Sequence, residues 1–393
     1  MIPKFRTQFN AEFTQQKYEK MLEKLKEKSG TYPMFRVSES PVFLSADFKH
    51  KLEDACKSII SQIKNMSPAE LSAAIPKHLI VPNDTEKPHF LTIDFGICKN
   101  EQGEIVPQLI ELQSFPSLYV FQKELQTAII DEYPFIAPLK SPYVEAEYYQ
   151  ELKDLIIGDE QPENVILLEI YPDTQKTNID FYLTEKKLGI KTVCLTKVKK
   201  EGRKLFYENQ GQLIEIKRIY NRVIFDELER LPDLKMEFDF RDDLEVKWVT
   251  HPNWFFKISK FILPKLESPY VPKSYFLADF PKDEKLGNFV LKPLFSFAGA
   301  GVNLTPTPED LENITDKNNY ILQRKVSYAP LFEDPAGDFS KAEIRLLYIW
   351  KDNEAEPKLL EHLVRMTKAD MVNVDFNKKN AIWIGGTTAF FAQ

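Results

Sequence analysis

The chain has few of the residues that build covalent or metal-bound scaffolds. Its 393 residues include only three cysteines, which lie far apart at Cys56, Cys98 and Cys194 with no CxxC pair. Five histidines are present, and none forms an HxxxH or HExxH pair. This scarcity argues against a disulfide framework and against a zinc site built from cysteine and histidine.

Long apolar runs and an excess of positive charge are also missing. No stretch of 18 apolar residues occurs, and the N-terminus lacks the apolar core of a signal peptide. The formal net charge is −7, which argues against a dedicated binder of nucleic acid or of an anionic membrane. We therefore expect a cytoplasmic protein with neither kind of partner, and the sequence leaves its oligomeric state open.

The composition is that of an ordinary globular protein, long enough for two or three domains. Residues 1–88 are predicted to be helical, and the charged helix over 12–28 is expected to face solvent. In the next helix Phe48, Leu52 and Cys56 recur at helical spacing, which indicates a core-facing stripe. Residues 164–250 have a βαβ rhythm, and helices alternate with strands over 251–393, so the expected fold class is α/β or α+β.

Residues 89–117 contain the most informative pattern, a hairpin of two strands. Apolar residues alternate with polar ones from Leu91 to Ile97, which indicates a half-buried strand. If Gln102-Gly103 is a two-residue turn, Asp94 lies opposite Glu111 and Thr92 lies opposite Gln113. One face then carries these four polar side chains, and the other carries the apolar residues Ile93, Phe95, Ile110 and Leu112.

Two facing carboxylates repel each other, and like charges across a strand pair destabilise it. A bound cation would remove that cost, and an oxygen-only ligand set suits Mg²⁺. Asp94 and Glu111 are therefore candidate metal ligands. The alternative is a solvated polar sheet face with a lysine nearby as counter-ion.

A second group of residues in the later half of the chain suits an anionic ligand. Lys292 ends an apolar strand and is followed by a small-residue loop, Gly299-Ala300-Gly301, whose backbone N–H groups can approach an anion closely. Arg345 and Arg365 lie within apolar strands, where an arginine needs an anionic partner such as a triphosphate. The alternatives are a tight hairpin with an exposed lysine and structural ion pairs of Arg345 with Glu343 or Asp338.

The order of these motifs resembles that of the ATP-grasp superfamily. Lys260, the VLKP strand with Lys292, the SFAGAGV loop, a hinge at Tyr320–Val326, EIRLL, LVRM, VNVDFN and WIGG follow one another as in that superfamily. The metal-binding strands come first instead of last, in IDFG and IELQSFPSLY. The resemblance is therefore to the circularly permuted, glutathionylspermidine synthase-type branch, and it covers about residues 89–393.

The resemblance implies an ATP-grasp fold with four parts. These are a helical N-terminal region at 1–88, a metal-site hairpin and helix at 89–160, a βαβ substrate domain at 161–250, and a nucleotide-binding part at 251–393. It implies ATP and Mg²⁺ as cofactors, and small-molecule carboxylate and amine substrates that are joined through an acyl phosphate. Its site residues map onto metal ligands Asp94, Glu111 and Gln113, nucleotide-binding residues Lys260, Lys292, Gly299, Ala300, Gly301, Gln323 and Lys325, and catalytic residues Arg345 and Arg365.

Two departures from the branch keep other functions open. Thr92 occupies the position where the branch has an arginine, and Gln113 replaces the metal-binding asparagine of the branch. A nucleotide-binding protein without ligase activity and an ATP-grasp kinase are therefore the alternatives. In the βαβ part, Arg222 ends a strand and is a candidate catalytic-site anchor for a substrate carboxylate, with an ion pair to Asp226 or Glu227 as the alternative.

Overall fold

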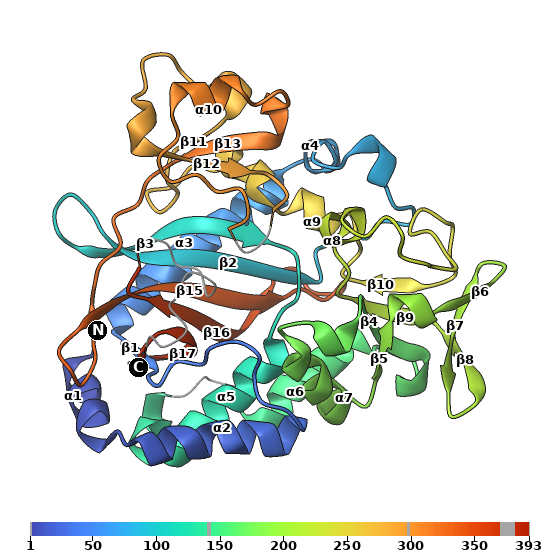
Figure 1. Cartoon of the computed structure of the whole chain (residues 1–393), viewed down its shortest axis with the longest axis horizontal. Helices are drawn as coiled ribbons and strands as arrows, with labels where there is room; N and C mark the ends of the chain where they lie inside the picture. The colour runs from blue at the N-terminus through green and yellow to red at the C-terminus, as the bar shows by residue number, and fades with distance from the viewer. Residues whose placement is uncertain (1, 140–142, 297–298, 370–381, 393) are drawn as a thin grey trace.

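The computed structural model describes residues 2–139, 143–296, 299–369 and 382–392. A seven-stranded mixed sheet forms the centre (Figure 1). Its strand order is β1-β17-β16-β15-β2-β3, and β14 pairs with β15 beside this path. The strands are β1 (Val42–Leu44), β2 (Phe90–Lys99), β3 (Ile105–Gln113), β14 (Phe332–Glu333), β15 (Phe339–Ile349), β16 (Lys358–Thr367) and β17 (Gly385–Phe391).

Strands from the two ends of the chain complete this sheet together. β2 pairs antiparallel with β15, so that Asp94 lies beside Arg345 across a sequence separation of 251 residues. β16 pairs with both β15 and β17, and β1 closes the far edge parallel to β17. The hairpin of residues 89–117 is therefore built into the sheet that the C-terminal strands form.

Helices cover both faces of the central sheet. Alternate sheet residues such as Leu91 and Ile93 pack on α3 (Ala46–Asn65). Phe90 and Leu347 pack instead with the helices of the opposite face, which Figure 1 shows below the sheet. These helices are α1 (Pro3–Glu12), α2 (Gln15–Ser29), α5 (Tyr119–Glu132), α6 (Glu145–Ile156) and α7 (Asn178–Leu188).

The N-terminal residues pack into the core of the molecule. The helix expected to face solvent, α2, buries Tyr18, Met21 and Leu25 in the core that it shares with α5 and α7. That interpretation was wrong because the charged residues of α2 surround a narrow apolar stripe. The region also contributes the strand β1, together with the short helix α4 (Pro68–Ser72).

A parallel four-stranded sheet confirms the βαβ rhythm. β4 (Val165–Glu169) is followed by α7 and by β5 (Lys191–Cys194), which pairs parallel to β4. β9 (Arg218–Asn221) and β10 (Lys247–Val249) extend the sheet on the other side of β4. A small antiparallel sheet of β6 (Lys199–Glu201), β7 (Lys204–Asn209) and β8 (Gln212–Ile216) projects from it, and α8 (Phe225–Glu229) follows β9.

A separate antiparallel sheet, which we call the third sheet, lies above the β2–β3 hairpin, at the top of Figure 1. It contains β11 (Ser274–Phe276), β13 (Tyr320–Arg324) and β12 (Phe289–Pro293), in that order, and it carries the short helix α10 (Pro308–Glu312). The segment with α9 (Trp254–Lys257) connects it to the parallel sheet. Within the described ranges, no helix is both long enough and apolar enough to cross a membrane.

Gly385 allows the extended segment before β1 to join the sheet. Its φ is +115°, and an added Cβ would lie 2.4 Å from the carbonyl oxygen of Arg36. That carbonyl accepts a hydrogen bond of 2.8 Å from the N–H of Gly386. A side chain at residue 385 would therefore overlap backbone that is already fixed by hydrogen bonding.

We expect Gly385→Ala to lower the free energy of unfolding by about 2 kcal/mol or more, because both the positive φ and the backbone overlap oppose a Cβ. Gly287→Ala is the matched control, since Gly287 has no neighbour within 4 Å of its added Cβ and no positive φ. Urea unfolding of both variants measures the difference. Equal stability of the two variants would contradict this account of Gly385.

Candidate functional site

The hairpin brings the predicted polar residues to one face through a β-bulge. Asp94 pairs with Glu111 and Thr92 with Gln113, as predicted. The predicted two-residue turn is wrong, since Lys99 pairs with Ile105 and five residues form the loop. The register shifts by one residue between Asp94 and Phe95, and this shift restores the predicted pairs.

Because of the bulge, Ile110 lies on the opposite face of the hairpin from the one that the sequence predicts. The sequence alternation assigns Ile110 to the apolar face, but it lines the cavity on the polar face. Its carbonyl oxygen accepts a hydrogen bond of 3.2 Å from Lys292 Nζ, and the carbonyl of Leu109 accepts one of 3.2 Å from Gln323 Nε2. The extra residue thus frees two carbonyl groups that dock the third sheet onto the hairpin.

A cavity of about 1090 Å³ lies where the central sheet, the parallel sheet and the third sheet meet. Most of the predicted site residues line it, from all three sheets and the segments that connect them. These residues are Glu111, Gln113, Arg222, Lys260, Lys292, Gly299, Gln323, Lys325, Arg345 and Arg365.

Asp94 lies behind the cavity lining, completely buried, between two arginines. Arg345 donates to both of its oxygens, with Nε 2.6 Å from Oδ1 and Nη2 2.7 Å from Oδ2, and Arg365 Nη2 donates to Oδ2 as well. The two carboxylates of the hairpin are therefore separated by basic groups. The expectation of uncompensated repulsion was wrong because Arg345 and Arg365 come from strands distant in the sequence.

Glu111 faces the cavity with 26% of its side chain exposed. Its carboxylate lies 3.7 Å from Lys260 Nζ and 3.5 Å from Arg345 Nη2. Burial raises the pKa of Glu111, but the positive charges of Lys260, Arg365, Arg345 and Lys292 outweigh burial and lower that pKa to about 2. We call these four basic residues the cationic centre.

Lys292 is a buried cation of this centre. Its Nζ donates a 2.6 Å hydrogen bond to Gln323 Oε1, and both side chains are buried. Burial lowers the pKa of Lys292 to about 8, although Glu111 raises it, and the charge of Lys260 lowers it further. Lys292 therefore changes its charge close to physiological pH.

Glu343 is a site residue that the predicted set omits. It lies on the cavity face of β15, two residues from Arg345, and its carboxylate is 3.1 Å from Arg365 Nη2. It also accepts a hydrogen bond from the hydroxyl of Tyr328. Burial raises the pKa of Glu343. The alternation of EIR in the sequence signals that Glu343 and Arg345 share a face, but it does not identify their partners.

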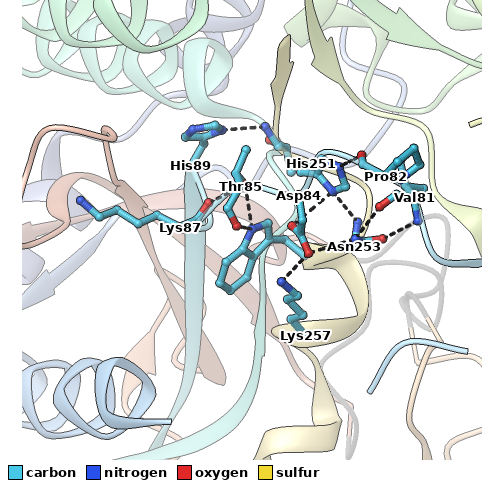
Figure 2. Close-up of polar contacts among 11 residues, drawn as sticks. Val81, Pro82, Asp84, Thr85, Lys87, His89, His251, Asn253 and Lys257 are labelled. Atoms are coloured by element: carbon cyan, nitrogen blue, oxygen red, sulfur yellow. Dashed lines mark hydrogen bonds and ion pairs between the residues drawn. The ribbon is translucent and has the colours of Figure 1, made fainter. Parts of the chain in front are cut away.

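A network of polar contacts holds the segment that carries Lys260 (Figure 2). Asp84 accepts hydrogen bonds from Asn253 Nδ2 at 3.0 Å and from Lys257 Nζ at 2.6 Å. The ring of His251 donates from Nε2 to the carbonyl of Pro82 at 2.9 Å. These bonds tie the segment over 81–85 to α9, and Lys260 follows α9 by three residues with its Nζ 2.8 Å from the carbonyl of Ser296.

Of the predicted glycine loop, Gly299 lines the cavity and Ala300 and Gly301 do not, and part of the loop lies outside the described residues. Gly299 and Gly301 both have positive φ, and an added Cβ at Gly301 would lie 2.8 Å from Pro293 Cγ. Ala300 is exposed between them. Lys325 Nζ donates to the carbonyl of Gly287 at 2.7 Å. VNVDFN, with Asn373, Asp375 and Asn377, lies outside the described residues.

At the other end of the cavity, Arg222 does not form the ion pair with Asp226 or Glu227 that the sequence leaves open. Arg230 pairs with Asp226, and Gln175 donates to Glu227. The sequence prediction also lacks several residues that line the cavity. Most come from parts of the chain without a motif, whereas Phe115 lies within the IELQSFPSLY segment. The omitted residues are Met34, Phe35, Arg36, Phe115, Phe121, Gln122 and Glu169.

A comparison with known proteins supports the fold and leaves the activity undetermined. No protein-family model and no curated protein sequence matches the chain. Among solved structures, it is similar to a glutathione synthetase-like effector from Globodera pallida in its apo form. The two chains are 11% identical with a TM-score of 0.55, and the match covers 96% of this chain and 97% of that one. At this identity the likeness concerns the backbone fold alone.

We expect Asp94→Asn to lower the free energy of unfolding by about 3 kcal/mol, because it leaves Arg345 and Arg365 buried without a full counter-charge. Glu111→Gln is the comparison, and we expect about 1 kcal/mol or less, since Glu111 is partly exposed and more distant from its partners. Urea unfolding at pH 7 measures both. If Asp94→Asn stabilises the protein, repulsion between the two carboxylates dominates after all.

We also expect sulfate, whose own charge is constant over this range, to bind more weakly as the pH rises from 7 to 9.5. Lys292, whose pKa is lowered to about 8, is charged below that pH and neutral above it, so its attraction for an anion is lost on the alkaline side. Calorimetric titrations across this range measure the affinity. Lys292→Arg keeps its charge and should flatten the profile, whereas an equally steep profile in that variant would assign the effect to another group.

Proposed function

We propose that this protein is an ATP- and Mg²⁺-dependent carboxylate–amine ligase of circularly permuted ATP-grasp type that acts through an acyl phosphate. The observation that carries the proposal is the cationic centre. Lys260, Lys292, Arg345 and Arg365 come from four separate segments and face one cavity. Four cations placed together in a buried site require anions, and a triphosphate supplies more negative charge than the acids of the site alone.

The cavity also suits the remainder of a nucleotide. The third sheet contributes Val290 and Gln323 to its lining, and Val302 and Val326 follow from the adjoining loop and hinge. Apolar walls with a few polar groups are typical of sites for planar ligands. At about 1090 Å³ the cavity exceeds the size of most single-ligand sites, so it has space for substrates beside a nucleotide.

The residues present fit a nucleotide better than they fit a metal ion. Glu111 faces the cavity, but both oxygens of Asp94 accept hydrogen bonds from arginines. The side-chain amide of Gln113 is hydrogen-bonded when its oxygen is turned toward Arg345, 3.0 Å from Nη1. Among the residues that the structure describes, no group of three or more histidine, cysteine or acidic side chains is arranged to hold a metal. In this arrangement Asp94 does not serve as a metal ligand, and we derive no step through Mg²⁺.

In the proposed reaction a substrate carboxylate oxygen attacks the γ-phosphorus of ATP, which releases ADP and forms an acyl phosphate. An amine then attacks the acyl carbon, and phosphate leaves as the amide forms. Lys260 and Lys292 hold the phosphates of the nucleotide, and Arg345 and Arg365 stabilise the negative charge on the transferred group. The remaining contribution of the protein is to orient the substrates.

A second candidate function, nucleotide binding without ligation, is favoured by the state of Asp94. Arg345 engages both of its oxygens, and Thr92, which replaces an arginine of the branch, is buried and donates to the carbonyl of Gln113. A site with this arrangement retains cations for phosphate but has one acidic ligand less for a metal. The similar protein from Globodera pallida is itself described as an effector.

We expect Lys292→Met and Lys260→Met each to weaken the binding of ADP by about tenfold or more, because each removes a buried charge–phosphate interaction. Lys282→Met is the matched control, since Lys282 is exposed and does not line the cavity. Calorimetric titration with ADP measures all four proteins. If the wild-type protein does not bind ADP, both candidate functions are wrong.

Turnover separates the candidates once binding is known. The wild-type protein is incubated with ATP, Mg²⁺ and a mixed panel of acids and amines, and ADP and product masses are recorded. The ligase proposal predicts ADP together with an amide product. ADP binding without turnover across the panel would favour the second candidate, and a phosphorylated hydroxyl product would indicate a kinase instead.

A further inference from the structure

Arg222 is a buried cation that the cationic centre does not explain. It follows β9 in the parallel sheet, lines the cavity, and is only 5% exposed. Its guanidinium carbon lies 4.4 Å from the ring centroid of Phe115 and 5.2 Å from that of Phe181. The two rings hold the guanidinium in one position without using its in-plane hydrogen-bond donors.

Most of those donors have no acceptor. Nη2 donates to Thr177 Oγ1 at 3.3 Å, whereas Nε and Nη1 have no hydrogen-bond partner among the residues that the structure describes. A buried guanidinium with unused N–H groups is costly unless a ligand satisfies them. The fork of N–H groups on arginine matches the two oxygens of a carboxylate.

Glu169 lies next to Arg222 but is too far away to satisfy it. Its Oε2 is 3.7 Å from Arg222 Nε, and its Oε1 accepts a 2.8 Å hydrogen bond from the N–H of Ile170. Burial raises the pKa of Glu169 to about 8, although the charge of Arg222 lowers it. At pH 7 the Glu169 carboxyl is therefore mostly neutral and has a proton to donate.

The other acids near this end are already engaged. Asp180 is buried, and its oxygens accept hydrogen bonds from the backbone N–H groups of Leu118 and Phe121. Glu227 accepts a hydrogen bond of 2.9 Å from Gln175. Arg36, which also lines the cavity, is ion-paired with Glu39. Donors of Arg222 therefore remain available for an anionic ligand.

We propose that Arg222 and Glu169 form a subsite for a substrate carboxylate that does not react. The carboxylate would accept from Nη1 and from the second N–H of Nη2, which are adjacent donors of the Arg222 guanidinium, and from the carboxyl group of Glu169. The substrate at this end of the cavity is then an amino acid or a peptide-like acid, and a polyamine is disfavoured by the charge of Arg222. That assignment of a substrate rests on the proposed function, whereas the anion subsite itself does not.

N-acetylglycine is the probe, with neutral N-acetylglycinamide as its matched control and spermidine as the polycation. Calorimetric titrations are carried out with saturating ADP, which occupies the cationic centre. We expect N-acetylglycine to bind about tenfold or more tightly than either of the other compounds. We expect Arg222→Met to remove this preference, and Arg222→Lys to retain part of it because it keeps the charge without the fork.

A second readout concerns Glu169. As the pH rises from 7 to 9, Glu169 becomes charged and competes with the probe for Arg222, so the affinity for N-acetylglycine should fall. Glu169→Gln should bind the probe with little change over this range, which separates Glu169 from the titration of Lys292. Arg222→Lys covers the case in which Arg222→Met does not fold, as judged by circular dichroism.

The subsite is contradicted if N-acetylglycine binds no more tightly than its amide, or if the preference persists in Arg222→Met. Equal losses of ADP and probe binding in a folded Arg222→Met would also contradict it, because the effect would then not be confined to this end of the cavity. The proposed function fails separately: if ADP does not bind, titrations of the probe without nucleotide still test Arg222.

Discussion

The hydrogen-bonded ion pairs of Asp94 connect the fold to the site. Asp94 lies on β2, and its two oxygens bind Arg345 of β15 and Arg365 of β16. These three strands are neighbours in the central sheet, although β2 is more than 200 residues away from the others in sequence. One buried carboxylate therefore holds two arginines at the floor of the cavity, and their charges in turn keep Glu111 ionised.

The same constraint sets the balance of charge in the cavity. Asp94, Glu111 and Glu343 form ion pairs with Lys260, Arg345 and Arg365, and Lys292 adds a fourth cation to these three acids. Such a network tolerates burial only while every member keeps a partner. The bulge at Ile110 contributes to it, because the carbonyl that it frees holds Lys292 within reach of Glu111.

Local patterns in the sequence were sufficient to predict the parts of this site that depend on neighbours in the chain. The alternation around Asp94 predicted its strand and face, and the βαβ rhythm predicted the parallel pairing of β4 and β5. The predicted two-residue turn was wrong, but the predicted pairs of Asp94 with Glu111 and of Thr92 with Gln113 were right. A bulge that no local pattern signals shifts the register by one residue and so cancels the error in the turn. A two-residue period also assigned Ile110 to the wrong face for the same reason.

Contacts between distant segments were not predictable from periodicity. The pairing of Arg345 with Asp94 joins residues 251 positions apart, and the contribution of Phe35 and Arg36 to the cavity depends on a backbone bridge between Val37 and Gly386. Motif order could indicate which residues converge, but not which charges neutralise one another. The expected repulsion between Asp94 and Glu111 was wrong because the arginines that neutralise Asp94 come from distant segments.

The competition for Arg345 decides between the two candidate functions. Nε and Nη2 of Arg345 are bonded to Asp94, and Gln113 faces the remaining Nη1. A phosphate that binds Arg345 must therefore share or replace these acceptors. Replacement would free the oxygens of Asp94 and Gln113, two of the three metal ligands that the sequence predicts, and these residues would then be able to hold Mg²⁺, which would neutralise phosphate charge. If Asp94 keeps Arg345 while the other cations bind the phosphates, the nucleotide is held without the metal site that phosphoryl transfer requires.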